Sequence, residues 1–88
     1  MKLTVVWTPT AERELAALWV ENPQDRAAIS RTANCIDSIL GADPHTKGES
    51  RYDTVRVLLV PPLGVDFDVD VKDRKVYVLS VWYTRRNR

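Results

Sequence analysis

The stretch Val65-Asp66-Phe67-Asp68-Val69-Asp70-Val71 decides the fold class, because apolar and acidic residues alternate along it without a break. Successive side chains of a β-strand point to opposite faces, so a period of two predicts a strand with one buried and one solvated face. The apolar residues are expected to face the core, since the opposite register would bury three carboxylates. An antiparallel sheet that is covered on one side only is the usual setting for this pattern.

The same period of two marks further strands on either side of this stretch. Residues 54–60 and 76–82 are predicted strands, and residues 3–7 form a fourth near the N-terminus. The Pro- and Gly-containing segment 61–64 and the polar segment 72–75 are predicted turns. Within 54–60 the two faces of the strand carry Val55, Val57 and Leu59 on one side, and Arg56, Leu58 and Val60 on the other.

Two helices are predicted between the first strand and the second, at residues 9–21 and 23–40. Thr8-Pro9 and Asn22-Pro23 each place a capping residue before a proline, which is the usual start of a helix. Gly41 is expected to close the second helix, and the polar segment 42–53 is expected to be a loop. The order β-α-α-β-β-β predicts an α+β fold, with a helical hairpin packed on one face of a four-stranded antiparallel sheet.

The 88 residues are enough for one domain, and a composition of 44% hydrophobic and 28% charged residues is ordinary for a globular protein. A net charge of +1 hides an asymmetry: residues 1–70 carry a net of −4 and residues 71–88 a net of +5, with a short basic tail at 83–88. This basic end suggests a polyanionic or acidic partner, and the alternative is a solvated C-terminus.

No feature of the sequence indicates export or a membrane. The apolar run at residues 3–7 is too short for a signal peptide, and no stretch approaches the roughly 20 apolar residues of a membrane span. We therefore expect a cytoplasmic protein. The single cysteine, Cys35, cannot form an internal disulfide, and we interpret it as a small packed residue of the second helix.

The chain resembles the RelE/ParE toxin superfamily along nearly its whole length. Val6-Trp7-Thr8-Pro9-Thr10-Ala11 is similar to the family's strand-then-helix opening, and Ile36-Asp37-Ser38-Ile39-Leu40 with the following Asp43-Pro44 and Gly48 resembles its second helix and loop. A central hairpin follows, and Val78 to Asn87 resembles the last strand and basic end. The resemblance implies the toxin component of a type II toxin–antitoxin system. Its partner would be a cognate antitoxin, its target DNA gyrase or messenger RNA at the ribosome, and it would need no small-molecule cofactor.

The candidate catalytic residues for RNA cleavage are Arg56, Tyr83, Arg85 and Arg86. Arginines would stabilise the charged phosphate in the transition state, and Tyr83 or the loop residue His45 would carry protons. Arg51 and Tyr77 are further polar candidates near the same surface. The alternative is that Arg56 and the tail arginines form surface ion pairs with the three aspartates.

The row Asp66, Asp68 and Asp70 is expected to line the open face of the sheet, where it would repel phosphate. Same-face residues of a strand lie roughly 6.5–7 Å apart, so we do not expect these three to form a metal site. The sequence therefore leaves two functions open: a toxin with a macromolecular target, or a non-catalytic protein-binding module on the same scaffold. In either case Trp19 or Trp82 is expected to be partly exposed for a partner.

Overall fold

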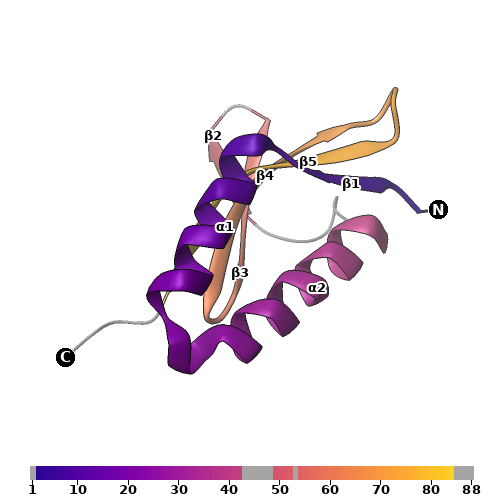
Figure 1. Ribbon diagram of the computed structural model, residues 1–88. Helices are drawn as coiled ribbons and strands as arrows, with labels where there is room; N and C mark the ends of the chain where they lie inside the picture. Colours follow the sequence, from indigo (N-terminus) through magenta and orange to yellow (C-terminus); the bar gives the residue numbers. More distant parts are fainter. Residues whose placement is uncertain (1, 43–48, 53, 85–88) are drawn as a thin grey trace.

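Five strands form one sheet in the order β1-β5-β4-β3-β2, and two helices connected by a short turn pack on one of its faces (Figure 1). The computed structural model describes residues 2–42, 49–52 and 54–84. This arrangement confirms the predicted α+β class and the helical hairpin. The elements are β1 (Thr4–Trp7), α1 (Pro9–Glu21), the 3₁₀ turn η1 (Pro23–Asp25), α2 (Arg26–Ala42), β2 (Glu49–Tyr52), β3 (Val55–Val60), β4 (Leu63–Asp70) and β5 (Lys75–Tyr83).

The sheet is mixed and not wholly antiparallel as predicted. β3, β4 and β5 form the expected antiparallel meander, but β1 pairs with β5 in parallel, with Thr4 opposite Lys75 and Trp7 opposite Val78. Alternation in a sequence shows which residues share a face of a strand. It does not show which strand becomes the neighbour, and here the last strand returns beside the first.

A short strand, β2, lies within the segment 42–53 that the sequence predicted to be a loop. It pairs antiparallel with β3 at the edge of the sheet, with Glu49 opposite Val57 and Ser50 opposite Arg56. Its sequence, Glu-Ser-Arg-Tyr, has no apolar alternation. The strand is therefore held by main-chain pairing, which leaves no hydrophobic signal in the sequence.

Along β4 the predicted faces are correct, but its limits are shifted. Val65 and Phe67 are fully buried, whereas Val71, predicted to face the core, is 67% exposed because β4 ends at Asp70. Leu63 and Gly64, predicted to belong to a turn, are the first residues of β4. The turn between β3 and β4 is therefore restricted to Pro61 and Pro62.

β5 contains a bulge that changes which residues face the helices. Its register against β4 shifts between Asp66 and Phe67, which pair with Ser80 and Val78 respectively. Val76 and Val78 are buried before the bulge, and Val81 is buried after it. A bulge inserts one residue into one strand of the pair, so the inward-facing positions move from even to odd numbers along β5.

The first helix begins where the sequence predicted, whereas α2 begins at Arg26, three residues after the predicted start. The side-chain oxygen of Thr8 accepts a hydrogen bond from the N–H of Ala11, and its hydroxyl donates to the carbonyl of Val78, which fastens the start of α1 to β5. The predicted second helix is a 3₁₀ turn followed by α2. α2 does not stop before Gly41 but continues to Ala42, and the carbonyl of Gly41 accepts a hydrogen bond from the N–H of Leu3.

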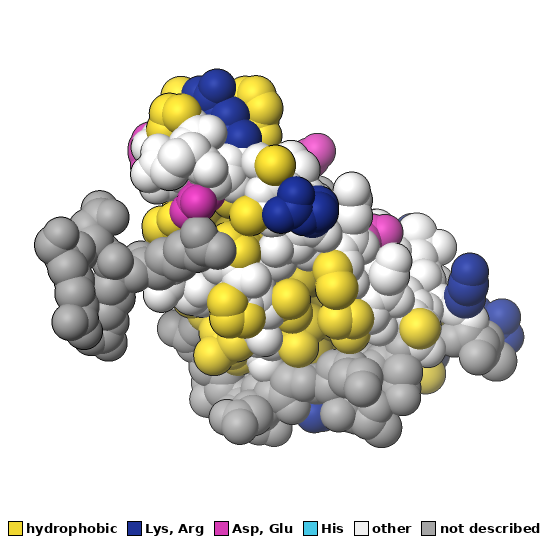
Figure 2. Space-filling view, turned by 90° about the horizontal axis from the view of Figure 1, so that it is seen from below, with side chains coloured by type: hydrophobic (Ala, Val, Ile, Leu, Met, Phe, Trp, Pro, Cys, Tyr) yellow, Lys and Arg dark blue, Asp and Glu magenta, His cyan; other side chains and the backbone are white. Residues whose placement is uncertain are grey.

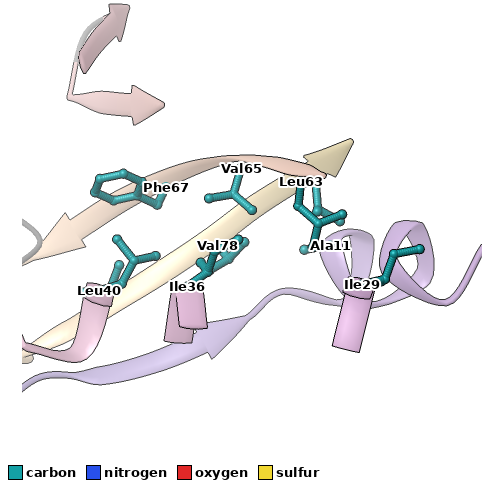
Figure 3. Packing of buried hydrophobic residues seen from close by; sticks show 10 residues of the cluster. Ala11, Ile29, Ile36, Leu40, Leu63, Val65, Phe67 and Val78 are labelled. Carbon is teal, nitrogen blue, oxygen red and sulfur yellow. The ribbon is translucent and has the colours of Figure 1, made fainter. Parts of the chain in front are cut away.

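The core lies between the helices and the sheet (Figure 3). Phe67 and Val65 point from β4 toward Leu40 and Ile36 of α2, and Leu63 lies near Ala11 of α1 at the other end. Burial of these apolar side chains is the main favourable contribution to folding. The opposite face of the sheet carries no helix in the described part of the chain, so it and the outer surface of the helix pair are the surfaces available for function.

Candidate functional site

The open face of the sheet can be assigned residue by residue from the strand register, because directly paired residues point to the same side. Gly64 pairs with Leu59 and Trp82, Asp66 with Val57 and Ser80, Asp68 with Tyr77, and Asp70 with Lys75. The face is therefore apolar near the β3–β4 turn and acidic toward the β4–β5 turn. This confirms the predicted position of the acidic row.

The apolar end of this face is built around Gly64. A Cβ atom at Gly64 would lie 2.6 Å from ring atoms of Trp82 and 2.8 Å from Cδ2 of Leu59, so only glycine allows the indole to lie against the strand. Trp82 is half-buried by this packing, whereas Leu59 remains 59% exposed. The expectation that Trp82 or Trp19 is partly exposed is met by both, with Trp19 the more exposed.

The acidic row is not uniform. Asp68 and Asp70 are half-buried, but Asp66 is only 8% exposed and makes interactions within the fold. One oxygen of Asp70 accepts a hydrogen bond from the N–H of Asp73 and so caps the β4–β5 turn. Two of the three carboxylates therefore also have structural contacts, and the row still places negative charge along the middle of the open face.

Arg56 belongs to the side of the sheet that carries the helices. Arg56 pairs with Phe67, and Leu58, the next residue on the same face of β3, pairs with Val65. Phe67 and Val65 are core residues. The Nε atom of Arg56 is buried, and the residue makes interactions within the fold. Arg56 therefore does not share the face of the acidic row.

Tyr83 also lies on the helix-covered side. It follows the bulge, packs against the core, and its hydroxyl donates a hydrogen bond to the carboxylate of Asp25 in η1. Arg56 is level with Phe67 and Tyr83 with Leu63, so roughly 13 Å of β4 separates their positions along the sheet. The structure therefore does not bring these two candidate catalytic residues together.

Of the remaining candidates, the structure describes the side chain of Tyr77 only. Arg85, Arg86 and His45 lie outside the described residues, and of Arg51 only the backbone, within β2, is described. Tyr77 is half-buried on the open face beside Asp68. The catalytic role of Arg56, Tyr83, Arg85 and Arg86 thus stays a prediction.

A second surface is a groove of about 490 Å³ between the outer sides of α1 and α2. Trp19 is 42% exposed and Val20 61% exposed at its edge. Figure 2 shows hydrophobic side chains reaching the surface on the side seen from below, with cationic side chains among them. The lining is mainly apolar: Glu12, Leu15, Ala16, Trp19, Val20, Ile29 and Ser30.

Arg26 packs against Trp19, one of the residues that line this groove, and was not singled out by sequence reasoning. Its guanidinium carbon lies 4.3 Å from the centre of the Trp19 ring, and its Nε donates to the carbonyl of Trp19 over 2.8 Å. A second nitrogen donates to the carbonyl of Val20. Arg26 thus caps the C-terminal end of α1 and holds the indole at the surface. The only signal for this role in the sequence is the presence of an arginine in the first turn of the predicted second helix.

Three further observations concern metal ligands, the cysteine and membrane-spanning helices. Among the residues that the structure describes, no three His, Cys, Asp or Glu side chains lie close enough to hold a metal ion. Cys35, predicted to be packed, is exposed on α2, because it lies on the side of the helix that faces away from the sheet. Neither of the two described helices combines the length and apolarity needed to cross a membrane.

No protein-family model and no curated protein match the sequence. Among solved structures, the chain is similar to one from the toxin–antitoxin complex RelBE2 of Mycobacterium tuberculosis, with a TM-score of 0.72 and 23% identity over 94% of this chain and 99% of that chain. It is also similar to a chain from the chromosomal ParDE TA system of P. aeruginosa, with a TM-score of 0.77 and 17% identity over 96% and 98% of the two chains. The chain therefore has a RelE/ParE-like fold.

Proposed function

We propose that this chain is the toxin component of a type II toxin–antitoxin system, which inhibits growth through DNA gyrase or translation and is neutralised by an antitoxin. The observation that carries the proposal is the extent of the structural likeness. More than nine-tenths of this chain and nearly all of the two similar chains superpose; one of these comes from a toxin–antitoxin complex and the other from a TA system.

The groove between α1 and α2 supports the expectation of an antitoxin partner. It is apolar, open to solvent and edged by Trp19 and Val20, and exposed apolar surface of this kind is typical of a protein-binding site. An amphipathic antitoxin segment, expected to come from the C-terminal part of that protein, would place its apolar side chains in the groove.

The arrangement of charged and hydroxyl groups favours a target that is not cleaved. A ribonuclease would need cations and a proton carrier converging on one phosphate. Here the hydroxyl of Tyr83 donates a hydrogen bond to the carboxylate of Asp25, and the carboxylates of Asp68 and Asp70 lie on the open face. Inhibition by binding, as at DNA gyrase, needs no such set of residues.

The test is induced expression in a bacterial host, with and without the adjacent reading frame, followed by pull-down of its product. Growth arrest relieved by the neighbouring gene is the expected result. Val20→Gln should weaken binding of the adjacent gene's product about tenfold, because the glutamine amide would be buried in the groove without a hydrogen-bond partner. Val71→Gln is the matched control, since Val71 is exposed to a similar degree (67% against 61% for Val20) but lies at the β4–β5 turn.

The second candidate function is a non-catalytic binding module on this scaffold. The acidic open face favours it, because this face would not attract an RNA substrate. Under this alternative the neighbouring protein still binds and Val20→Gln still weakens binding, but expression of the chain alone leaves growth unchanged. Normal growth together with no bound neighbour would contradict both functions.

A further inference from the structure

Three basic residues of the C-terminal part of the sequence lie far from the last described residue, Thr84. Lys72, Arg74 and Lys75 lie at the turn between β4 and β5, whereas Thr84 lies at the other end of β5. A strand of nine residues is roughly 30 Å long, and the longest extent of the molecule is 41 Å. The cations of the turn therefore form a surface of their own, far from the last described residue.

The turn holds its arginine in a conformation that favours glycine. Arg74 has a φ of 53°, in the left-handed region. Hydrogen bonds from the N–H of Asp73 to Asp70 and from the N–H of Arg74 to the carbonyl of Val71 close the turn, and the carbonyl of Arg74 accepts from the N–H of Thr4. The two of these bonds that involve Arg74 use its backbone only, so a glycine would satisfy them with less strain.

The cationic side chains of Lys72 and Arg74 have no structural role that the described residues reveal. Lys72 and Arg74 are exposed, and within the described part of the chain neither side chain forms a hydrogen bond or an ion pair. Arg74 therefore combines a strained backbone with an exposed charge. Strain of this kind persists at functional sites, so it points to a function for the Arg74 side chain.

The surrounding charges leave this end of the molecule positive. Exposed Lys2 precedes β1, whose first residue pairs with Lys75, so it lies at the same end as the turn (Figure 1). Lys75 pairs with Asp70 in register, and Asp73 is the other acidic residue of the turn. Figure 2 shows Lys and Arg side chains at this right-hand end of the molecule.

We propose that the β4–β5 turn, with Lys72 and Arg74 as its main contacts and Lys2 beside them, binds the phosphate backbone of a nucleic acid. A four-residue turn is too small for a stable protein interface, which buries about 800 Å² on each partner. Phosphate contacts need only accessible cations, and they gain free energy from the release of condensed counterions. The acidic row begins at Asp70, so the nucleic acid meets the end of the sheet and not its open face.

This inference goes beyond the proposed function and does not depend on growth inhibition. Its test is the binding of labelled single-stranded RNA and of duplex DNA to the full chain, as salt is raised from about 50 to about 200 mM. The double variant Lys72→Gln, Arg74→Gln removes two charges at the turn. The matched control Arg13→Gln, Arg31→Gln removes two exposed charges from the helices, where the structure shows no such cluster.

The turn variant should bind about tenfold or more weakly at low salt, and the slope of log affinity against log salt should fall by about 1.4 to 1.8 for its two phosphate contacts. The control variant should keep the wild-type slope. The basic residues after Thr84 are present in both proteins, so they cannot produce this difference. A preference for RNA or for DNA identifies the natural ligand, and equal binding identifies phosphate as the shared feature.

Single variants of Arg74 separate charge from folding. Arg74→Lys should retain binding, whereas Arg74→Gly should weaken binding and yet raise the melting temperature, because glycine adopts a positive φ without strain. Equal losses in the turn and control variants, or wild-type protein that binds neither nucleic acid, would overturn the proposal. So would an Arg74→Gly variant that binds as tightly as wild type.

Discussion

At the end of β5, the hydroxyl of Tyr83 donates a hydrogen bond to the carboxylate of Asp25 and joins the last strand to the turn between the helices. Hydrogen bonds to charged groups typically contribute about 1.5–3 kcal/mol to stability. We expect Tyr83→Phe to lower the free energy of unfolding by about 1–2 kcal/mol, since Tyr83 is only half-buried. Urea denaturation with a linear extrapolation measures this change.

Tyr77→Phe is the control for this prediction, because Tyr77 is a half-buried tyrosine of the same strand whose hydroxyl forms no hydrogen bond with the described residues. It should change the free energy of unfolding by less than about 0.5 kcal/mol. Were Tyr83→Phe as stable as wild type but inactive toward the target, the residue would be a proton carrier, and its bond to Asp25 would be of minor importance.

The side of the sheet on which Tyr83 lies could not be predicted from the sequence. Counting by twos from Val76 and Val78 places residue 83 on the open face, where we expected it. The bulge reverses the count, so that Val81 and Tyr83 face the helices. The exposure of Trp19, in contrast, agrees with the expectation from the sequence, which left Trp19 and Trp82 as alternatives.

Among the elements, the bulge in β5 is stabilised by α1. The carboxylate of Glu14 accepts a hydrogen bond of 3.1 Å from the N–H of Val81, which is the first buried residue after the bulge. Glu14→Ala would leave this part-buried N–H without its partner, and we expect a loss of about 1–3 kcal/mol in the free energy of unfolding. Glu14→Gln retains an acceptor oxygen and should lose less than half as much.

Thermal denaturation of the two variants, with Glu12→Ala as a control, measures this prediction. Glu12 is exposed in the first turn of α1, so its removal should affect stability only through the helix dipole, by about 0.3–1 kcal/mol. Equal stability of Glu14→Ala and Glu14→Gln would show that the bulge does not depend on the carboxylate.

The predictability of the elements follows from how each is stabilised. α1 was predicted from Pro9 to Glu21, and the structure gives the same limits, because a cap, a proline and an apolar stripe all mark it locally. β2 was missed because it is held by pairing with β3, and the parallel direction of β1 was missed because it depends on the path of the whole chain. Local signals were therefore reliable, and pairing between distant segments was not.

At the scale of the molecule, the charge of the described residues varies along the sheet, from the β4–β5 turn to the β3–β4 turn. The β4–β5 turn is basic, the acidic residues of β4 follow it along the open face, and the end at the β3–β4 turn is apolar, with Leu59 and Trp82. This order differs from a uniformly basic groove, which a phosphodiester substrate would need for affinity. A nucleic acid would be attracted to the basic end and repelled from the middle of the sheet.

The purified protein should therefore cleave little messenger RNA on translating ribosomes. The acidic row lies on the open face, the hydroxyl of Tyr83 is bonded to Asp25, and Arg56 pairs with Phe67 on the helix-covered side. Moving either side chain to the open face would require the register of its own strand, β3 or β5, to change by one residue, which would turn every side chain of that strand to the other face.

Toeprinting on translating ribosomes, comparing wild type with the double variant Arg56→Ala, Arg85→Ala, measures this prediction. Strong cleavage by the wild type that is lost in the variant would contradict it, and would show that the two arginines act on phosphate despite the acidic row. A stability measurement on the variant is required beside it, since the Nε atom of Arg56 is buried and its loss could unfold the chain. Growth arrest without cleavage would direct attention to DNA gyrase, where inhibition depends on binding and the acidic face is no obstacle.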